Sequence, residues 1–364
     1  MEAKRNAKEL LFMGNSLPAR DDNLAKEYFC AGVGKFLDGK YEEAQQEFQE
    51  ALRFDPSLPL AYCYLGIISL ELGQLDRGLR WCEQGLEIDP DNGYLHYCLG
   101  AAFERKGQSQ EAIEQYQIYL KDHPKDAECL FSLGCAHDQA GQYQDALYYY
   151  RQSLQCDPSH YKASYNLALV LGEQGDTPSA IVCLKKTVEI NPTYWKGWIK
   201  LGLFYSYDKK WQEATEAYEK AVELKPEVSD SYYNLGLCYL SANKSKKAIH
   251  CFTEALKRNL GDADSSFYLA IAYIDLKDDS KAIEVLHNTL AIDLDHEKSH
   301  YLLGRLFFLR GEEQKGELEL AYLQKMKSPL AQSLKASLKE KLVPKRSSPR
   351  KKKSTSSSEG AAPA

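Results

Sequence analysis

The chain has 364 residues, of which 44% are hydrophobic and 27% are charged. This length suits one large domain, two ordinary domains or a repeat array. No apolar run approaches the roughly 20 residues that a membrane-spanning helix needs. The apolar stretch at residues 10–13 is also shorter than the roughly 7–15 residues of a signal-peptide core. We therefore expect a cytoplasmic protein with no membrane span.

The charge is divided between an acidic body and a basic end. Residues 343–364 carry six Lys or Arg and one Glu, a net charge of +5, and the whole chain carries −6, so residues 1–342 sum to −11. An acidic body argues against a body that binds nucleic acid. The ten cysteines are scattered without a CxxC pair, which is typical of reduced, buried thiols rather than of a disulfide framework.

Taken in chain order, residues 1–24 form an N-terminal segment in which residues 4–13 predict a capping helix. From residue 25 to residue 330 the chain repeats every 34 residues, which gives nine units. Prolines keep this interval at Pro56, Pro90, Pro124, Pro158, Pro192 and Pro226. Small residues keep it at Gly32, Gly66, Gly100, Gly134, Ala168, Gly202, Gly236, Ala270 and Gly304. Two residue classes in one register indicate tandem repeats.

Each unit contains two apolar stripes of helical period, separated by a short polar turn that often holds Gly. Glycine there permits the left-handed backbone that closes a helix. Proline is predicted to end the second helix, because it cannot continue the backbone ladder. The last three units have Leu260, Leu294 and Ser328 instead, and Gly261 is predicted to end the helix in the first of them.

The C-terminal part begins with a predicted capping helix at residues 329–342. Pro329 suits a first helical turn, and Leu330, Leu334, Leu338 and Leu342 then recur every four residues. Residues 343–364 have no apolar period and are predicted to be disordered. Their basic residues suit a nuclear-import signal, a phosphate-binding arm for nucleic acid or an anionic surface, a contact to acidic protein, or a solubilising tail; they are Lys345, Arg346, Arg350, Lys351, Lys352 and Lys353.

The repeat resembles the tetratricopeptide repeat, which has small residues at positions eight and twenty, aromatic residues at eleven and twenty-four, and proline at thirty-two. Residues 195–228 match this pattern nearly completely, with Trp198, Gly202, Tyr205, Ala214, Tyr218, Ala221 and Pro226. The resemblance implies an all-α, right-handed superhelical solenoid of about nine helix-turn-helix repeats. It also implies that positions two, five, nine and twelve line a concave groove.

The groove candidates come from positions five and six of the units. They are Phe29, Tyr97, Phe131, Tyr165, Tyr233 and Phe267 at position five, and Asn166 and Asn234 at position six. Such an aromatic surface suits an extended or helical peptide with apolar anchors; packing between helices is the alternative interpretation of the same residues. Position nine is apolar or Cys from Val33 to Ile271. The asparagine of a carboxylate clamp for Hsp70 or Hsp90 tails is therefore missing.

No catalytic motif of the P-loop, GxGxxG, GxSxG or HExxH type occurs. Cys129, Cys135 and His137 come closest to a metal-ligand group, but they are better explained as packing residues of a repeat. We predict no catalytic residues, metal or cofactor. The predicted function is a non-enzymatic scaffold or adaptor that binds proteins. The alternatives are a chaperone for hydrophobic or secreted clients, and tethering to nucleic acid or an anionic surface through the tail, with nuclear localisation in that case.

Overall fold

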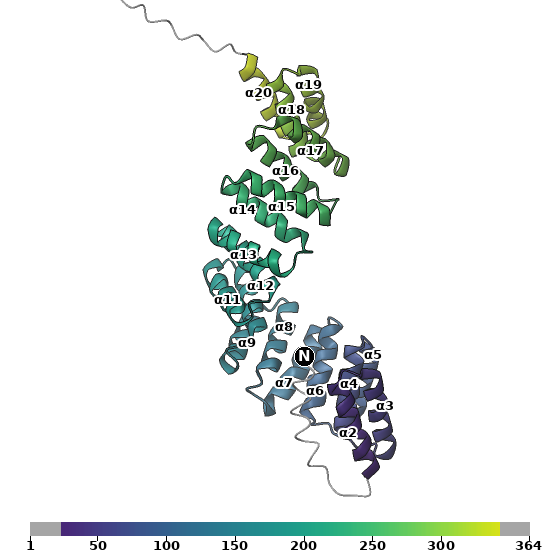
Figure 1. The fold of residues 1–364 in the computed structure, drawn as a ribbon. Helices are drawn as coiled ribbons and strands as arrows, with labels where there is room; N and C mark the ends of the chain where they lie inside the picture. The colour runs from purple at the N-terminus through teal and green to yellow at the C-terminus, as the bar shows by residue number, and fades with distance from the viewer. Residues whose placement is uncertain (1–22, 343–364) are drawn as a thin grey trace, which may run out of the picture. The chain divides into compact units, whose positions relative to one another are not determined.

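The computed structural model describes residues 23–342 (Figure 1). The predicted N-terminal helix at residues 4–13 and the basic tail at residues 343–364 lie outside these residues. The chain divides into two compact units, residues 1–225 and 226–364. Within residues 23–342 every regular element is an α-helix. The all-α prediction is confirmed.

The first compact unit contains six consecutive helix pairs. Its helices are α2 (Asn23–Leu37), α3 (Tyr41–Phe54), α4 (Pro59–Glu71), α5 (Leu75–Ile88), α6 (Gly93–Arg105), α7 (Ser109–Asp122), α8 (Ala127–Gln139), α9 (Tyr143–Cys156), α10 (Tyr161–Glu173), α11 (Thr177–Ile190), α12 (Trp195–Tyr207) and α13 (Trp211–Leu224). Each even-numbered helix is the first helix of a repeat and each odd-numbered helix the second.

The second compact unit contains three more pairs and a final single helix. Its helices are α14 (Ser229–Ser241), α15 (Ser245–Arg258), α16 (Ala263–Asp275), α17 (Asp279–Ile292), α18 (Glu297–Arg310), α19 (Glu313–Lys325) and α20 (Leu330–Leu342). The nine pairs across residues 23–342 begin within two residues of the starts predicted from the 34-residue interval.

The turn inside each pair has a left-handed residue at one fixed repeat position. Six of the nine turns place Gly there, with φ between 72° and 84°. The other three place Lys209, Asn243 and Lys277 there, with φ of 57°, 56° and 61°. The next backbone N–H closes the helix end, as when Gln142 donates to the His137 carbonyl over 2.8 Å. The turn therefore keeps its geometry whether or not glycine is present.

Small residues at repeat position eight let the two helices of a pair approach each other. A Cβ atom added to Gly134 would lie 2.7 Å from the ring of Tyr150, and one added to Gly100 would lie 2.8 Å from the ring of Tyr116. Both rings are buried. The aromatic side chain of the second helix thus packs directly on the backbone of the first, which explains the small-residue series.

An Asx residue shapes five of the turns between repeats, three with a proline and two without. The side chains of Asp55, Asp157, Asn191, Asn259 and Asp293 each accept a hydrogen bond from the backbone N–H two residues later. The prediction that Gly261 ends its helix is wrong. Helix α15 already ends at Arg258 with Asn259 as its C-cap, and Gly261 lies beyond, with no left-handed φ.

Helix α20 begins at Leu330, where the sequence predicts a capping helix at residues 329–342, and it packs against the last pair. The Ser328 hydroxyl accepts from the Leu330 backbone N–H over 3.2 Å. Ala331 and Leu334 pack in a cluster with Phe308, Leu320 and Leu323. Leu334 also fills the space over Gly304, where a Cβ atom would lie 2.5 Å from its side chain. The side chains of Leu338 and Leu342 lie outside the described residues.

Candidate functional site

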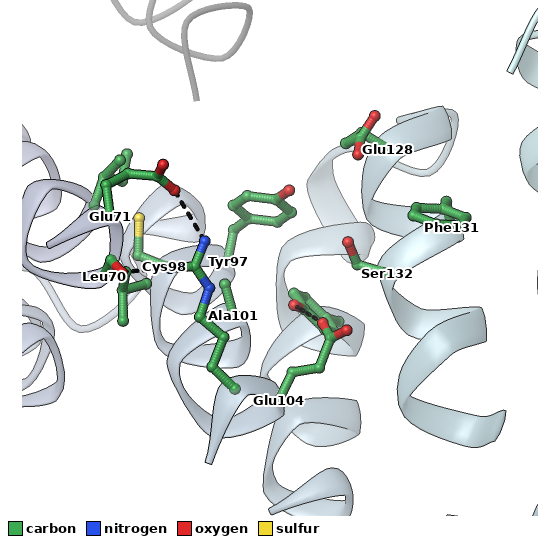
Figure 2. A pocket seen from close by; sticks show the side chains of 12 residues that line it. Leu70, Glu71, Tyr97, Cys98, Ala101, Glu104, Glu128, Phe131 and Ser132 are labelled. Atoms are coloured by element: carbon green, nitrogen blue, oxygen red, sulfur yellow. Dashed lines mark hydrogen bonds and ion pairs between the residues drawn. The ribbon is translucent and has the colours of Figure 1, made fainter. Parts of the chain in front are cut away.

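A hollow of about 210 Å³ opens on the first helices of three consecutive repeats in the first compact unit (Figure 2). We call it the Tyr97 pocket. Helices α4, α6 and α8 supply all of its lining except Tyr116, which comes from α7. The lining residues are Ile67, Leu70, Glu71, Tyr97, Cys98, Ala101, Glu104, Arg105, Tyr116, Glu128, Phe131 and Ser132. Nine of these occupy positions two, five, nine, twelve or thirteen of their repeats.

Two of the predicted groove residues, Tyr97 and Phe131, line this pocket. Both side chains are half-buried. The Tyr97 ring lies 5.7 Å from that of Tyr116, and the Phe131 ring lies 4.7 Å from that of His160. Burial, more than any neighbouring charge, holds the pKa of the Tyr97 hydroxyl well above its usual value, so this group stays neutral. The pocket thus has aromatic walls fixed by packing.

Charged side chains form the other part of the lining. Arg105 donates to the Leu70 carbonyl and, over 2.9 Å, to Glu71. Glu104 accepts from the Tyr116 hydroxyl over 2.7 Å. Glu128 lies 3.2 Å from the Nε2 atom of His160. Figure 2 shows the carboxylates of Glu71, Glu104 and Glu128 distributed around the Tyr97 ring.

Phe29 occupies the same repeat position as Tyr97 but is a core residue. Its ring is 4% exposed and packs on Phe48 and Tyr64 at 5.5 and 5.8 Å. Tyr64 stands at position six of the following repeat, where the repeat after Tyr97 has Ser132. A large side chain therefore covers Phe29, while the small Ser132 leaves the pocket open beside Tyr97.

Tyr165 and Asn166 lie one repeat further along the first compact unit. The Tyr165 ring is half-buried against Tyr194 at 5.2 Å, and burial raises its pKa to about 12. The Asn166 amide donates to the Cys135 sulfur over 3.3 Å and to the Tyr150 hydroxyl over 3.4 Å. Asn166 thus joins α10 to α8 and α9.

The remaining predicted groove residues belong to the second compact unit. Tyr233 is half-buried, with its ring 5.9 Å from that of Tyr268. Asn234 donates to the Asp230 carbonyl of its own helix over 2.8 Å. Phe267 is 6% exposed and packs against His296 at 5.1 Å. Phe267, like Phe29, is a packing residue, and neither offers a surface for a ligand.

The three residues closest to a metal-ligand pattern make separate contacts. Cys129 approaches the Tyr116 carbonyl at 3.9 Å, Cys135 accepts from Tyr150, and His137 Nδ1 pairs with Gln142 at 2.6 Å. Among the described residues, no group of three or more His, Cys, Asp and Glu side chains is arranged to hold a metal ion.

A second hollow, of about 350 Å³, lies in the first compact unit among helices α11, α12 and α13. It includes Trp198, whose indole N–H donates to the Pro192 carbonyl over 2.8 Å. Two of its three helices are second helices of their repeats. The Tyr97 pocket is the better candidate, because three successive first helices build it.

Sequence reasoning missed the charged residues of the Tyr97 pocket. Glu128 occupies position two of its repeat, and Glu104 occupies position twelve. The resemblance placed both positions on the inward face, but the candidate residues were chosen for aromatic and amide side chains. A search for acidic residues at positions two and twelve of the repeats would have identified Glu128 and Glu104.

The tandem helix pairs define a repeat protein, and the family comparisons agree. Models described as tetratricopeptide repeat match residues 97–161 and 139–197, and one described as TPR repeat matches residues 35–73. A model described as anaphase-promoting complex, cyclosome, subunit 3 matches residues 208–289. The matched parts of the chain are therefore tetratricopeptide repeats, as the sequence resemblance predicted. No curated protein matches it.

Several solved structures are similar to parts of the chain. MamA from Desulfovibrio magneticus has 26% identity and a TM-score of 0.44, over 47% of this chain and 96% of that one. YrrB, described as a TPR protein with an unusual peptide-binding site, has 19% identity and a TM-score of 0.49, over 50% of this chain and 95% of that one. A tetratricopeptide repeat protein from Parabacteroides merdae has 18% identity and a TM-score of 0.48, over 68% and 98%.

The helices of the described region are too short or too polar to cross a membrane.

Proposed function

We propose that this protein is a non-enzymatic scaffold whose first compact unit binds an extended segment of a partner protein at the Tyr97 pocket. One observation carries the proposal. The half-buried rings of Tyr97 and Phe131 line a hollow on three successive first helices, the surface expected to receive peptides in this family. The remaining lining is mostly side chains held by their own packing, so the site is preformed.

The binding would come mainly from burial of an apolar side chain of the partner. Such burial contributes roughly 1.5–3 kcal/mol for one Val, Leu, Ile, Phe or Met side chain. Ile67, Leu70 and Ala101 supply aliphatic contact in the pocket, and the two aromatic rings supply flat faces. A preformed site loses little side-chain entropy on binding, which favours a weakly structured peptide as the ligand.

Photo-crosslinking in the cell tests this proposal. A crosslinking amino acid would replace Tyr97 in one variant and Tyr148 in the control. Tyr148 is a 55% exposed residue of α9 that does not line the pocket. We expect position 97 to give a defined partner segment and position 148 not to give it. The same partner from both positions, or from position 148 alone, would contradict the site.

Alanine variants give a second readout. Tyr97→Ala combined with Phe131→Ala should weaken binding of the crosslinked segment by at least tenfold, since each lost anchor is worth more than about 1 kcal/mol. Tyr148→Ala should leave the affinity unchanged. Circular dichroism melts of both variants show whether the fold survives each change.

The six basic residues within residues 343–364 favour a second function, contact with an anionic surface or nucleic acid. Removal of residues 344–364 separates this function from the first. Binding through the tail should disappear with the deletion and fall steeply with salt, whereas binding at the Tyr97 pocket should survive both changes.

A further inference from the structure

We infer that the Tyr97 pocket selects a cationic side chain, lysine or arginine, on the bound peptide. This inference rests on the proposed function and names the chemistry of its ligand. It is carried by charge complementarity together with the aromatic lining of the cavity: three carboxylates and one guanidinium line the same hollow.

The guanidinium of Arg105 is already engaged by neighbouring groups. One of its nitrogens donates to the Leu70 carbonyl, and the other lies 2.9 Å from Glu71. Arg105 and Glu71 therefore balance one another at one side of the pocket. The charge of the remaining lining comes from Glu104 and Glu128, so the pocket is acidic as a whole.

The side chain next to Glu128, His160, does not neutralise the charge of the Glu128 carboxylate. His160 accepts a hydrogen bond from the Ala163 backbone N–H at its Nδ1 atom, over 3.1 Å. Since that nitrogen acts as an acceptor, the ring proton is on Nε2, and the imidazole is neutral. The Nε2–H group then donates to Glu128 over 3.2 Å. Glu128 thus has a neutral donor, and its negative charge still attracts a cation.

The aromatic and aliphatic walls suit the rest of a lysine or arginine side chain. Such side chains lay their methylene stem along apolar surface and keep their charged head near polar groups. Ile67, Leu70 and Ala101 offer the apolar surface. The rings of Tyr97 and Phe131 can add a cation–π contact to the charged head. An uncharged anchor would bury on the same walls but would gain no attraction from the carboxylates.

The acidic character continues into the next repeat. Asp138 occupies the same repeat position as Glu104, and it is half-buried. Its closest hydrogen-bond donor is the neutral Tyr150 hydroxyl, at 3.5 Å. A peptide that runs along the first helices would therefore meet carboxylates from two consecutive repeats, and an acidic peptide would be repelled by both.

A phage library of random dodecapeptides, selected on the intact chain, tests the inference. The variants are the double change Glu104→Gln/Glu128→Gln and the matched control Glu114→Gln. Glu114 is an exposed glutamate of α7 that does not line the pocket. A third variant, Tyr97→Ala, reports whether selected peptides use the pocket. Thermal melts of each variant accompany the selections.

We expect the selected peptides to be enriched in Lys or Arg next to an apolar residue, with wild-type protein and with the Glu114 control. The double variant should lose the Lys and Arg enrichment and keep the apolar one. A synthetic peptide from the selection should bind about tenfold more weakly when its Lys becomes Gln, because the change removes a charge-assisted hydrogen bond to a carboxylate of the pocket.

Different selection results would contradict the cationic ligand and the peptide-binding function. Peptides that bind in a Tyr97-dependent way without Lys or Arg enrichment, or with Asp or Glu enrichment, would overturn the cationic ligand and keep the peptide-binding function. Peptides whose binding is indifferent to Tyr97→Ala, or an absence of selected peptides, would overturn both.

Discussion

The sulfur atoms of Cys63 and Cys98 lie 3.1 Å apart in the core of the first compact unit, between helices α4 and α6. Both side chains are buried, as is that of Cys82. Hydrogen bonds with the Cys63 and Cys82 thiols, and then burial, hold the pKa of Cys98 well above its usual value. The Cys98 sulfur therefore remains a protonated thiol where it also lines the Tyr97 pocket.

This relationship predicts the order in which the thiols react. The thiolate is the nucleophile, so a protonated, buried thiol should resist iodoacetamide. At neutral pH we expect alkylation of the exposed Cys30 and Cys156, and no alkylation of Cys63 or Cys98 until denaturant is added. Peptide mass spectrometry measures each site. Rapid labelling of Cys98 in the folded protein would show that reagent reaches this thiol, which would contradict its burial.

The left-handed turns predict opposite effects for the same glycine substitution. Gly141 has φ of 72°, whereas Gly34 lies in helix α2 with an ordinary φ and open space where a Cβ atom would stand. Gly141→Ala should lower the free energy of unfolding by about 1–2 kcal/mol. Gly34→Ala should raise it by about 0.5–1 kcal/mol. Lys209→Gly should also raise the free energy of unfolding, because glycine adopts this left-handed backbone without the strain that lysine has there. Urea unfolding measures all three, and a shared sign for the two alanine variants would contradict the turn geometry.

Asp138 predicts a pH-dependent stability. Burial, and then the charge of Glu173, raise the pKa of its carboxyl. Between the usual Asp pKa and the raised value, the folded state binds more protons than the unfolded state, so this group makes stability fall as pH rises. Asp138→Asn should therefore stabilise the protein at neutral pH.

The gain from Asp138→Asn should vanish below pH of about 4, where the carboxyl is protonated in both states. Urea unfolding at a series of pH values gives the comparison with wild type. The control is Asp145→Asn, at an exposed residue of the next helix. Its effect on the free energy of unfolding should not change in this way with pH.

The capping helix predicts a large effect from one leucine. Leu334 is fully buried against Gly304 and the cluster around Phe308. Leu334→Ala should cost about 2–5 kcal/mol, and Lys335→Ala, at an exposed neighbour, should stay within about 0.5 kcal/mol. Amide hydrogen exchange of α18 and α19 should become faster in the first variant alone. Equal exchange in both variants would mean that α20 does not cover the last pair.

Much of the fold was readable from residue classes at fixed spacing. The 34-residue interval determined the helix pairs, since small residues and turn residues must recur wherever helices of one length pack in one way. The turns without proline show the limit of this reasoning. Leu260 and Leu294 stand where proline was expected, yet the turns form, because Asn259 and Asp293 accept the hydrogen bonds that shape them.

The candidate site was only partly readable, because repeat position alone does not determine burial. Phe29 and Tyr97 share a position, but Tyr64 covers the first and Ser132 leaves the second open. The acidic lining likewise depends on which side chains converge: Glu71, Glu104 and Glu128 come from three helices and meet only in the packed array. The sequence by itself determined the repeat and its helices through local periodicity. The tertiary structure decided where a hollow remains and what charge it carries, since both depend on the side chains that neighbouring repeats place beside it.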